Sequence, residues 1–188
     1  MKIKENLPTL ERAFEEIKAL TGKSRKIVIT SHVNPDGDAI GSELAMYHVL
    51  KSLNKEVSII NHSPTPENLL FLKGAEDILN FADEKAKMIF NSADTVFVVD
   101  LSDPKRVISM TEAVLKSNAA KIVIDHHEEP KEFADSYAVD TNASSTGEII
   151  SRMLKSWNIV PDKDTTQALY TAIMTDTGSF RFPRTTPE

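Results

Sequence analysis

Acidic and histidine side chains gather directly after the short apolar runs of this sequence. One run is followed by His32, Asp36 and Asp38, a second by Asp100 and Asp103, and a third by Asp125, His126 and His127, while Asp176 lies in the later segment 174–179. Carboxylates mixed with imidazoles suit manganese, iron, cobalt or zinc better than calcium. Two such ions, about 3.5–4 Å apart, can share one bridging carboxylate and hold a water between them as hydroxide. The pattern therefore predicts a site for phosphoester hydrolysis.

The number of acids at one place also favours metal binding. Five carboxylates close together in a partly desolvated crevice would repel one another, and some would have to stay protonated. Divalent cations remove that cost. Asp36 and Asp38 are two residues apart, so their side chains can diverge from one loop toward two different ions. Pro35 and Gly37 suit a tight turn there, since glycine permits positive φ.

Several polar residues also have a simpler structural interpretation. Asp103 stands before Pro104 and is predicted to be a helix cap. His48 and His62 are interpreted as structural or exposed histidines. Residues 145–148 are predicted to begin a helix, whose free amides could also face a phosphate.

The elements that must position these residues alternate along the chain. Helical spacing is predicted over residues 10–20, with Gly22 as the C-terminal cap, over 39–53, around 107–115, over 146–157 and over 163–174. Short, β-branched apolar runs predict strands over 26–30, 56–60, 95–99 and 121–124. This alternation indicates an α/β fold, with a doubly wound, mainly parallel sheet and helices on both faces. Ligands in such sheets bind at the carboxyl ends of the strands.

Length and composition narrow the class of protein. A chain of 188 residues with 40% hydrophobic residues is long enough for a domain with a full core, and the absence of cysteine excludes a disulfide scaffold and a thiolate metal site. No stretch approaches the roughly 18 apolar residues of a membrane span, and the first residues lack the apolar region of a signal peptide. A cytoplasmic protein is therefore predicted. The net charge of -6 argues against binding duplex nucleic acid through a broad basic face.

Four segments of the sequence resemble the four ordered motifs of the DHH phosphoesterases. They are residues 32–42 (HVNPDGDAIGS), 98–100 (VVD), 125–127 (DHH) and 175–180 (TDTGSF). The resemblance covers residues 24–183. This superfamily includes RecJ-type exonucleases, NrnA-type oligoribonucleases, cyclic-dinucleotide phosphodiesterases and a class of inorganic pyrophosphatases. The resemblance implies the same α/β fold and two manganese ions as cofactors.

The resemblance also implies a role for individual residues. The metal ligands would be His32 and Asp36 for the first ion, Asp38, His126 and Asp176 for the second, and Asp100 as the catalytic bridge between both.

Three further residues receive roles around those ligands. Asp125 would orient His126 and fix its tautomer. His127 would contact the scissile phosphate, as a catalytic and substrate-binding residue, and stabilise the charge that develops on it. Asn34, inside the first motif, would touch the substrate.

On this resemblance we expect manganese-dependent hydrolysis of short oligonucleotides or small nucleotides, by in-line attack of a hydroxide that bridges two ions. Nano-RNA, linear dinucleotides and 3′-phosphoadenosine 5′-phosphate are the expected substrates, and the sequence does not choose among them. The sequence around Gly37 and Gly41 resembles the nuclease and oligoribonuclease branch more than the pyrophosphatases. Two alternatives stay open: an inorganic pyrophosphatase of the superfamily, and a metal-bearing nucleotide-binding module without turnover. The expected partner is a short single-stranded RNA or DNA or a small nucleotide, and neither duplex nucleic acid nor a membrane. The sequence leaves open whether a homodimer forms.

DHH proteins normally carry a second, smaller C-terminal domain that binds substrate, and nothing in this sequence matches its glycine-rich motif. We expect residues 1–183 to form the DHH catalytic domain, weakly active alone. Residues 180–183 are predicted to be extended, and residues 184–188 to begin a linker helix capped by Thr185. The hypothesis is that the chain is part of a longer protein, which the mass of the native gene product would test.

Overall fold

Six parallel strands form the centre of the fold. In the computed structural model, which describes residues 7–183 and 185–186, their order across the sheet is β3-β2-β1-β4-β5-β6. In chain order they are β1 (Lys26–Thr30), β2 (Glu56–Asn61), β3 (Leu79–Asn80), β4 (Thr95–Val99), β5 (Ala120–Asp125) and β6 (Ser136–Val139). Every neighbouring pair is parallel. The strand order reverses between β1 and β4, which is the place where ligands bind in doubly wound sheets.

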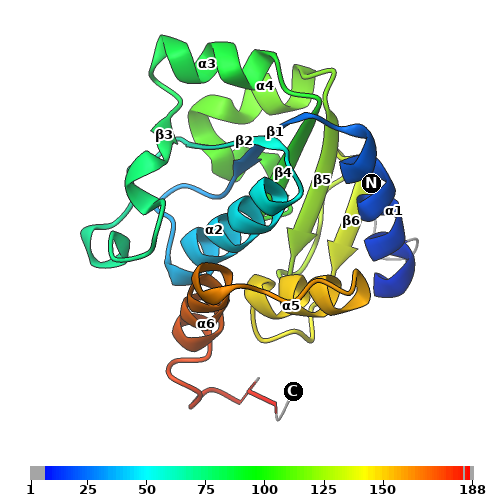
Figure 1. The fold of residues 1–188 in the computed structure, drawn as a ribbon, viewed down its shortest axis with the longest axis vertical. Coiled ribbons are helices and arrows are strands. Elements are labelled where there is room, and N and C mark those ends of the chain that lie inside the picture. Colours follow the sequence, from blue (N-terminus) through cyan, green and yellow to red (C-terminus); the bar gives the residue numbers. More distant parts are fainter. Residues whose placement is uncertain (1–6, 184, 187–188) are drawn as a thin grey trace.

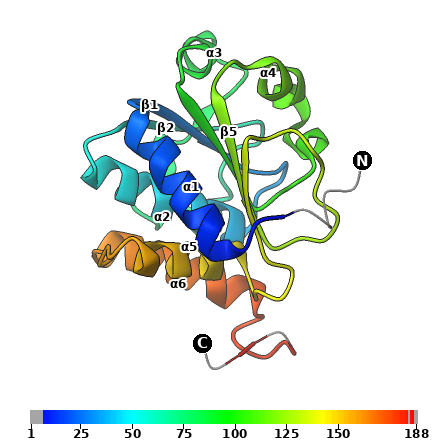
Figure 2. The ribbon, with the colours of Figure 1, turned by 90° about the vertical axis from the view of Figure 1, so that its right-hand side faces the viewer.

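Helices cover both faces of this sheet, as predicted. The helices are α1 (Leu10–Lys23), α2 (Gly37–Ser52), α3 (Glu84–Asn91), α4 (Thr111–Lys116), α5 (Thr146–Ser156) and α6 (Lys163–Asp176). Figure 2 shows α1, α2 and α5 on one side of the sheet and α3 and α4 on the other. Helix α6 packs on α2 and α5, near the ends toward which the arrows of β5 and β6 point in Figure 1. The fold is a three-layer α/β/α arrangement.

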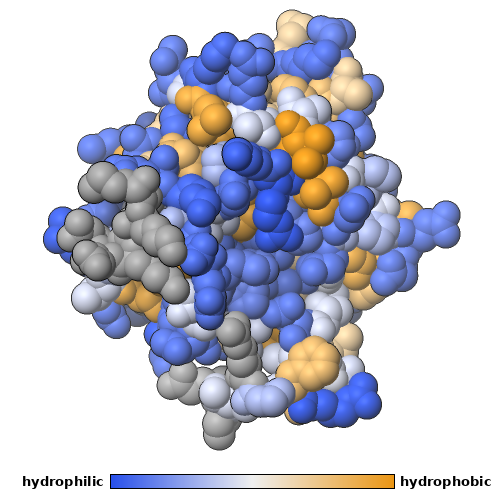
Figure 3. Space-filling model, turned by 180° about the vertical axis from the view of Figure 1, so that it is seen from behind, coloured by the Kyte–Doolittle hydropathy of each residue, from blue (hydrophilic) through white to orange (hydrophobic). Residues whose placement is uncertain are grey.

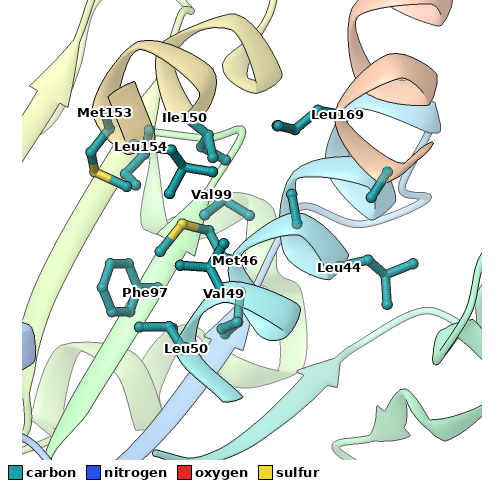
Figure 4. Packing of buried hydrophobic residues seen from close by; sticks show 14 of the residues in the cluster. Leu44, Met46, Val49, Leu50, Phe97, Val99, Ile150, Met153, Leu154 and Leu169 are labelled. Carbon is teal, nitrogen blue, oxygen red and sulfur yellow. The ribbon is translucent and has the colours of Figure 1, made fainter. Parts of the chain in front are cut away.

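Two apolar clusters, one on each face, hold the layers together. The larger cluster joins α2 and α5 to the sheet, with the side chains of Met46, Val49, Leu50, Phe97, Val99, Ile150, Met153 and Leu154 pointing toward one another in Figure 4. The other cluster packs α3 and α4 on the opposite face. Since the central strands are covered on both sides, all five residues of β4 are buried. This double burial explains why the strands read as continuous apolar runs.

Some predicted boundaries are wrong. Helix α1 continues through Gly22 and ends with Ser24 as its C-cap. The helix predicted around 107–115 is split into a 3-10 segment, Pro104–Met110, and α4, and the 3-10 segment is itself kinked at Ile108, with φ 47 and ψ -101. The sequence reading also missed β3, β6 and α3, which are short.

The segment after α6 is turned rather than extended. Gly178, Ser179 and Phe180 all have positive φ, and they reverse the chain directly after the helix. The Phe182 ring then packs on Gly178, where an added Cβ would lie 2.5 Å from it. The predicted extended segment 180–183 is therefore wrong. Residues 184, 187 and 188, in the predicted linker helix, lie outside the described residues.

The face opposite to that of Figure 1 is predominantly hydrophilic, and its apolar side chains lie in small separate groups (Figure 3). Across residues 7–183 and 185–186, the structure contains no helix with the length and apolar character required to cross a bilayer.

Candidate metal centre

The first motif forms the loop between β1 and α2. Asp36 caps α2, because its Oδ1 accepts hydrogen bonds from the backbone N–H groups of Asp38 at 3.0 Å and Ala39 at 3.1 Å. The residue with positive φ in this loop is Asn34, at 53°, and not Gly37. Gly37 is instead required by a close approach to α6, since a Cβ there would lie 2.4 Å from Oγ1 of Thr175. The predicted reason for this glycine was wrong.

The carboxylate of Asp38 is clamped by the N-terminus of α5. Its Oδ2 accepts a hydrogen bond from the backbone N–H of Thr146 at 2.7 Å, and its Oδ1 accepts one from Gly147 at 2.9 Å. Ser145 caps this helix by accepting from the N–H of Glu148, so residues 145–148 do begin a helix. The two amides that seemed free for a phosphate are occupied by Asp38.

Asp100 lies at the switch point of the sheet, directly after β4. Its side chain is 2% exposed and its φ is 60°, a conformation that aspartate tolerates better than most residues. The Thr146 hydroxyl donates to its Oδ1 at 3.0 Å. Oδ2 lies 3.2 Å from His32 Nε2, and Oδ1 lies 3.7 Å from His126 Nε2. The two oxygens of Asp100 therefore face two different histidines.

The same ring nitrogen, Nδ1, anchors the two buried histidines to the backbone. It lies 2.8 Å from the Val33 carbonyl in His32 and 3.3 Å from the Ala143 carbonyl in His126. Because a carbonyl only accepts, Nδ1 carries a proton in both rings, and Nε2 is the nitrogen that faces the acids. In His126, Nε2 lies 3.4 Å from Asp176 Oδ2. An imidazole nitrogen and a carboxylate oxygen at such distances need a proton or a cation between them.

Asp125 orients His127, so the expectation that it orients His126 is wrong. Its Oδ1 accepts from Nδ1 of His127 at 2.7 Å and from the backbone N–H of His127 at 3.2 Å. His126 instead directs its Nδ1 to the Ala143 carbonyl, and the two imidazole rings lie next to each other with their centroids 4.6 Å apart. Burial alone would raise the pKa of Asp125, but the His127 imidazole holds this pKa below its ordinary value. The same bond raises the pKa of His127.

The buried acids are unfavourable as free anions. Burial, followed by the charges of Asp36 and Asp125, raises the pKa of Asp100 to about 8. Burial and the charge of Asp100 raise the pKa of Asp38 well above its ordinary value, although two backbone amides oppose the shift. A nearby cation would favour the charged forms of both acids. The donor set therefore fits divalent cations.

The structure brings the predicted ligands together in compact groups. Within each group the ligand atoms all lie within 4.8 Å of one another. The first group is His32, Asp36 and Asp100, the second is Asp38, His126 and Asp176, and the third is Asp100, His126 and His127. Asp100 belongs to two of them. These acids and histidines can bind metal ions, and Asp100 stands where it can serve two.

The remaining predicted residues lie around this centre. Asp103 caps the 3-10 helix Pro104–Met110, as predicted, and accepts from Lys105 N–H at 3.0 Å. His48 bonds the Lys73 carbonyl, and His62 bonds Ser109, which fits their structural interpretation. Asn34 is exposed, and its contact with substrate stays a prediction.

Sequence reasoning missed Thr146 and the carbonyl of Ala143 as partners of the centre. The Ser145–Glu148 capping pattern located the start of α5, but it did not show which acid the helix would meet. A backbone carbonyl leaves no signal in the residue types.

Comparisons with known proteins agree with this geometry. The profile of the DHH family, N-terminal domain, matches residues 26–173. A bifunctional oligoribonuclease and PAP phosphatase NrnA of Thermus thermophilus is 33% identical over 174 residues, which are 93% of this chain and 49% of the relative. Its Bacillus subtilis counterpart is 29% identical over 85% of this chain and 49% of its own length. The chain thus spans about half the length of these curated relatives.

Solved structures show the same similarity. An exopolyphosphatase-related protein from Bacteroides fragilis has a TM-score of 0.91 at 33% identity, over 94% of this chain and 53% of that one. Exonuclease RecJ bound to manganese shares the fold, with a TM-score of 0.54 at 13% identity over 90% of this chain and 43% of that one. Together with the family profile, which matches most of the sequence, these similarities show that the chain belongs to the DHH family.

Proposed function

We propose that this chain is the catalytic part of a manganese-dependent phosphoesterase. Its substrates would be short single-stranded oligonucleotides or small nucleotides, such as linear dinucleotides, nano-RNA and 3′-phosphoadenosine 5′-phosphate. The observation that carries the proposal is the arrangement of His32 and His126, whose Nε2 atoms face opposite oxygens of the buried Asp100. The relatives named as oligoribonucleases and PAP phosphatases support this substrate class.

The proposed ligands fall into two sets that share Asp100. The sets are His32, Asp36 and Asp100, and Asp38, His126, Asp176 and Asp100. Two Mn²⁺ ions bound there would supply Lewis acidity and lower the pKa of the attacking water. The protein fixes the ligands in advance, because Thr146 holds both Asp38 and Asp100 by hydrogen bonds.

His127 is proposed to bind the scissile phosphate. Its side chain is 43% exposed, whereas those of His32 and His126 are 6% and 8% exposed. The hydrogen bond with Asp125 raises the pKa of His127 and so favours the doubly protonated ring. In that form Nδ1 donates to Asp125, and Nε2 is left to donate to a phosphoryl oxygen as negative charge develops.

Domain organisation is part of the proposal. Residues 1–183 would form the catalytic unit, and residues 184–188 would begin the connection to a substrate-binding part. The length of the relatives supports this division, since the chain covers 49% of each of two of them. Groups that read base and sugar would then lie mainly outside the chain.

The test is hydrolysis of a diribonucleotide with and without Mn²⁺, with pyrophosphate and 3′-phosphoadenosine 5′-phosphate assayed in parallel. Asp100→Asn is the informative variant, because asparagine also tolerates the left-handed backbone of this position. We expect it to abolish Mn²⁺-dependent turnover while the fold persists, and Asp100→Ala to do the same. Asp103→Ala is the matched control: it removes a nearby helix cap outside the proposed ligands, at a cost of about 0.5–2 kcal/mol in stability.

Each outcome has a distinct meaning. Near wild-type turnover by Asp100→Asn would refute the role of this carboxylate. A preference for pyrophosphate would indicate the inorganic pyrophosphatase alternative. Mn²⁺ and nucleotide binding without turnover, in a longer native protein that contains this chain, would indicate a binding module.

A further inference from the structure

Glu43 is a buried acid that the proposed ligand sets do not use. It lies in α2, and its side chain is 0% exposed. Burial raises the pKa of Glu43 to about 7, and the hydrogen bond from Asn61 opposes that shift. Replacing a buried charged group by an apolar one of similar volume is often neutral or stabilising. The acid at this position therefore calls for a reason other than stability.

The partner of Glu43 is an asparagine at the end of β2. The Asn61 side chain is also buried, at 1% exposure, and its Nδ2 donates to Oε2 of Glu43 at 3.0 Å. Its Oδ1 accepts from the backbone N–H of Ser31 at 3.2 Å and from the Thr30 hydroxyl at 3.3 Å. By accepting from Nδ2, Glu43 holds the amide in the orientation in which Oδ1 faces the Ser31 N–H.

The Asn61 side chain continues the hydrogen bonding of β1 beyond the last residue that pairs with the neighbouring strands. The last register pairs of β1 are Ile29 with Ile59 of β2 and Thr30 with Val98 of β4. The next backbone N–H, that of Ser31, donates to the side-chain Oδ1 of Asn61 instead of to a backbone carbonyl of a neighbouring strand.

The residue that follows Ser31 is His32, and it is also anchored on its other side. The N–H of Val33 donates to the Arg106 carbonyl at 2.8 Å, and the His32 ring bonds the Val33 carbonyl. His32 thus lies between two anchors, and Glu43 controls one of them.

We infer that Glu43, acting through Asn61, is a positioning residue that fixes His32 and thereby sets the affinity of the group His32, Asp36 and Asp100 for a divalent cation. The inference rests on the proposed function, because it assumes that this group binds a cation. It assigns a role to Glu43 and Asn61, neither of which would touch the cation.

The test measures Mn²⁺ binding by titration calorimetry and thermal unfolding in the absence of metal. Glu43→Gln keeps an acceptor for Asn61, so we expect Mn²⁺ affinity to stay within about threefold of wild type. Glu43→Met leaves the Asn61 amide without its acceptor, so we expect one of two Mn²⁺ sites to weaken by about 10–100-fold, the usual effect of losing an outer partner of a ligand.

The double variant Glu43→Met/Asn61→Leu separates positioning from stability. It removes the Glu43–Asn61 pair but leaves the buried Ser31 N–H without its acceptor, which costs about 1–3 kcal/mol. We expect its melting temperature to fall and the weaker Mn²⁺ site to persist, whereas a variant that only loses stability keeps its Mn²⁺ affinity. Tyr137→Phe is the control for lost stability: it removes a buried hydroxyl that bonds Phe133 and Ala134, so it should lower the melting temperature and leave Mn²⁺ affinity unchanged.

The outcomes separate this inference from the proposed function. If wild type binds no Mn²⁺, the proposed function fails, and the inference fails with it. If wild type binds two ions and the folded double variant binds both equally well, the inference alone is overturned.

Discussion

Helices α2 and α6 meet at a glycine, and an alanine there should push them apart. A Cβ on Gly41 would lie 2.6 Å from the Ala168 carbonyl oxygen and 2.9 Å from Cβ of Ala172. The obstruction includes backbone atoms of α6, so no side chain can simply rotate away. Gly22, in the last turn of α1, is the matched control, because a Cβ there meets nothing within 4 Å.

The two substitutions should change stability in opposite directions. Alanine in a helix is favoured over glycine by roughly 0.5–1 kcal/mol, so Gly22→Ala should raise the free energy of unfolding by about that amount. Gly41→Ala gains the same helix propensity but overpacks the contact between α2 and α6, which typically costs about 1–3 kcal/mol. The net expectation is a loss of up to about 2.5 kcal/mol. At roughly 2–4 °C per kcal/mol for a chain of this size, the melting temperature should fall by up to about 10 °C.

Thermal and urea unfolding, followed by circular dichroism, would measure both variants. The Mn²⁺ affinity should also fall in Gly41→Ala, because α2 begins beside Asp38 and α6 ends with Asp176. If Gly41→Ala proved as stable as Gly22→Ala, the helices would be able to separate without cost, and the argument from close packing would be refuted.

Three other expectations concern metal, acid and backbone strain. Mn²⁺ at about 100 times its dissociation constant should stabilise the protein by about 2.7 kcal/mol, and a chelator should reverse the rise in melting temperature. A melting temperature that changes neither with Mn²⁺ nor with the chelator would contradict this. The Asp94 carboxylate accepts hydrogen bonds from the backbone N–H groups of Lys26 and Arg25, and these bonds lower the pKa of Asp94. The stability that Asp94 contributes is therefore present above its ordinary pKa of 3.8 and is lost as pH falls through the lowered pKa. Asp94→Asn should make unfolding less sensitive to acid, which urea titrations from pH 6 to about 2 would check against wild type. Ile108 has a φ of 47° and is 50% exposed. Ile108→Gly should therefore relieve backbone strain and raise the free energy of unfolding by about 1 kcal/mol. A lower free energy of unfolding in the same urea assay would refute that.

The sheet could be predicted where its strands are buried on both faces. The run Thr95–Val99 shows this most clearly, because every residue in it contacts a helix layer or the next strand. The edge strand Ser136–Val139 has only four residues and begins with a serine, so its pairing with β5 depends on the fold and not on its own pattern. The two residues of β3 give even less signal.

The candidate centre was predictable in its residue types and less so in its contacts. Strand ends in a parallel sheet meet at one edge, which is enough to bring Asp100 and His126 together. The pairing of Asp125 with His127 could not be predicted from strand alternation, because β5 ends at Asp125 and both histidines follow it. The close approach of Gly37 to Thr175 could not be predicted, since it depends on two helices that are far apart in the sequence.

The clamp on Asp38 also has a consequence during synthesis of the protein. Thr146, which holds this carboxylate, lies 108 residues downstream. A ribosome releases the whole first motif long before it translates the amides of α5, so the growing chain carries these acids for many seconds without their final geometry. Metal captured in that interval meets a flexible and weak set of ligands. With the proposed ligands, loading at full affinity would therefore be confined to chains that have formed both α5 and α6, since α6 ends with Asp176.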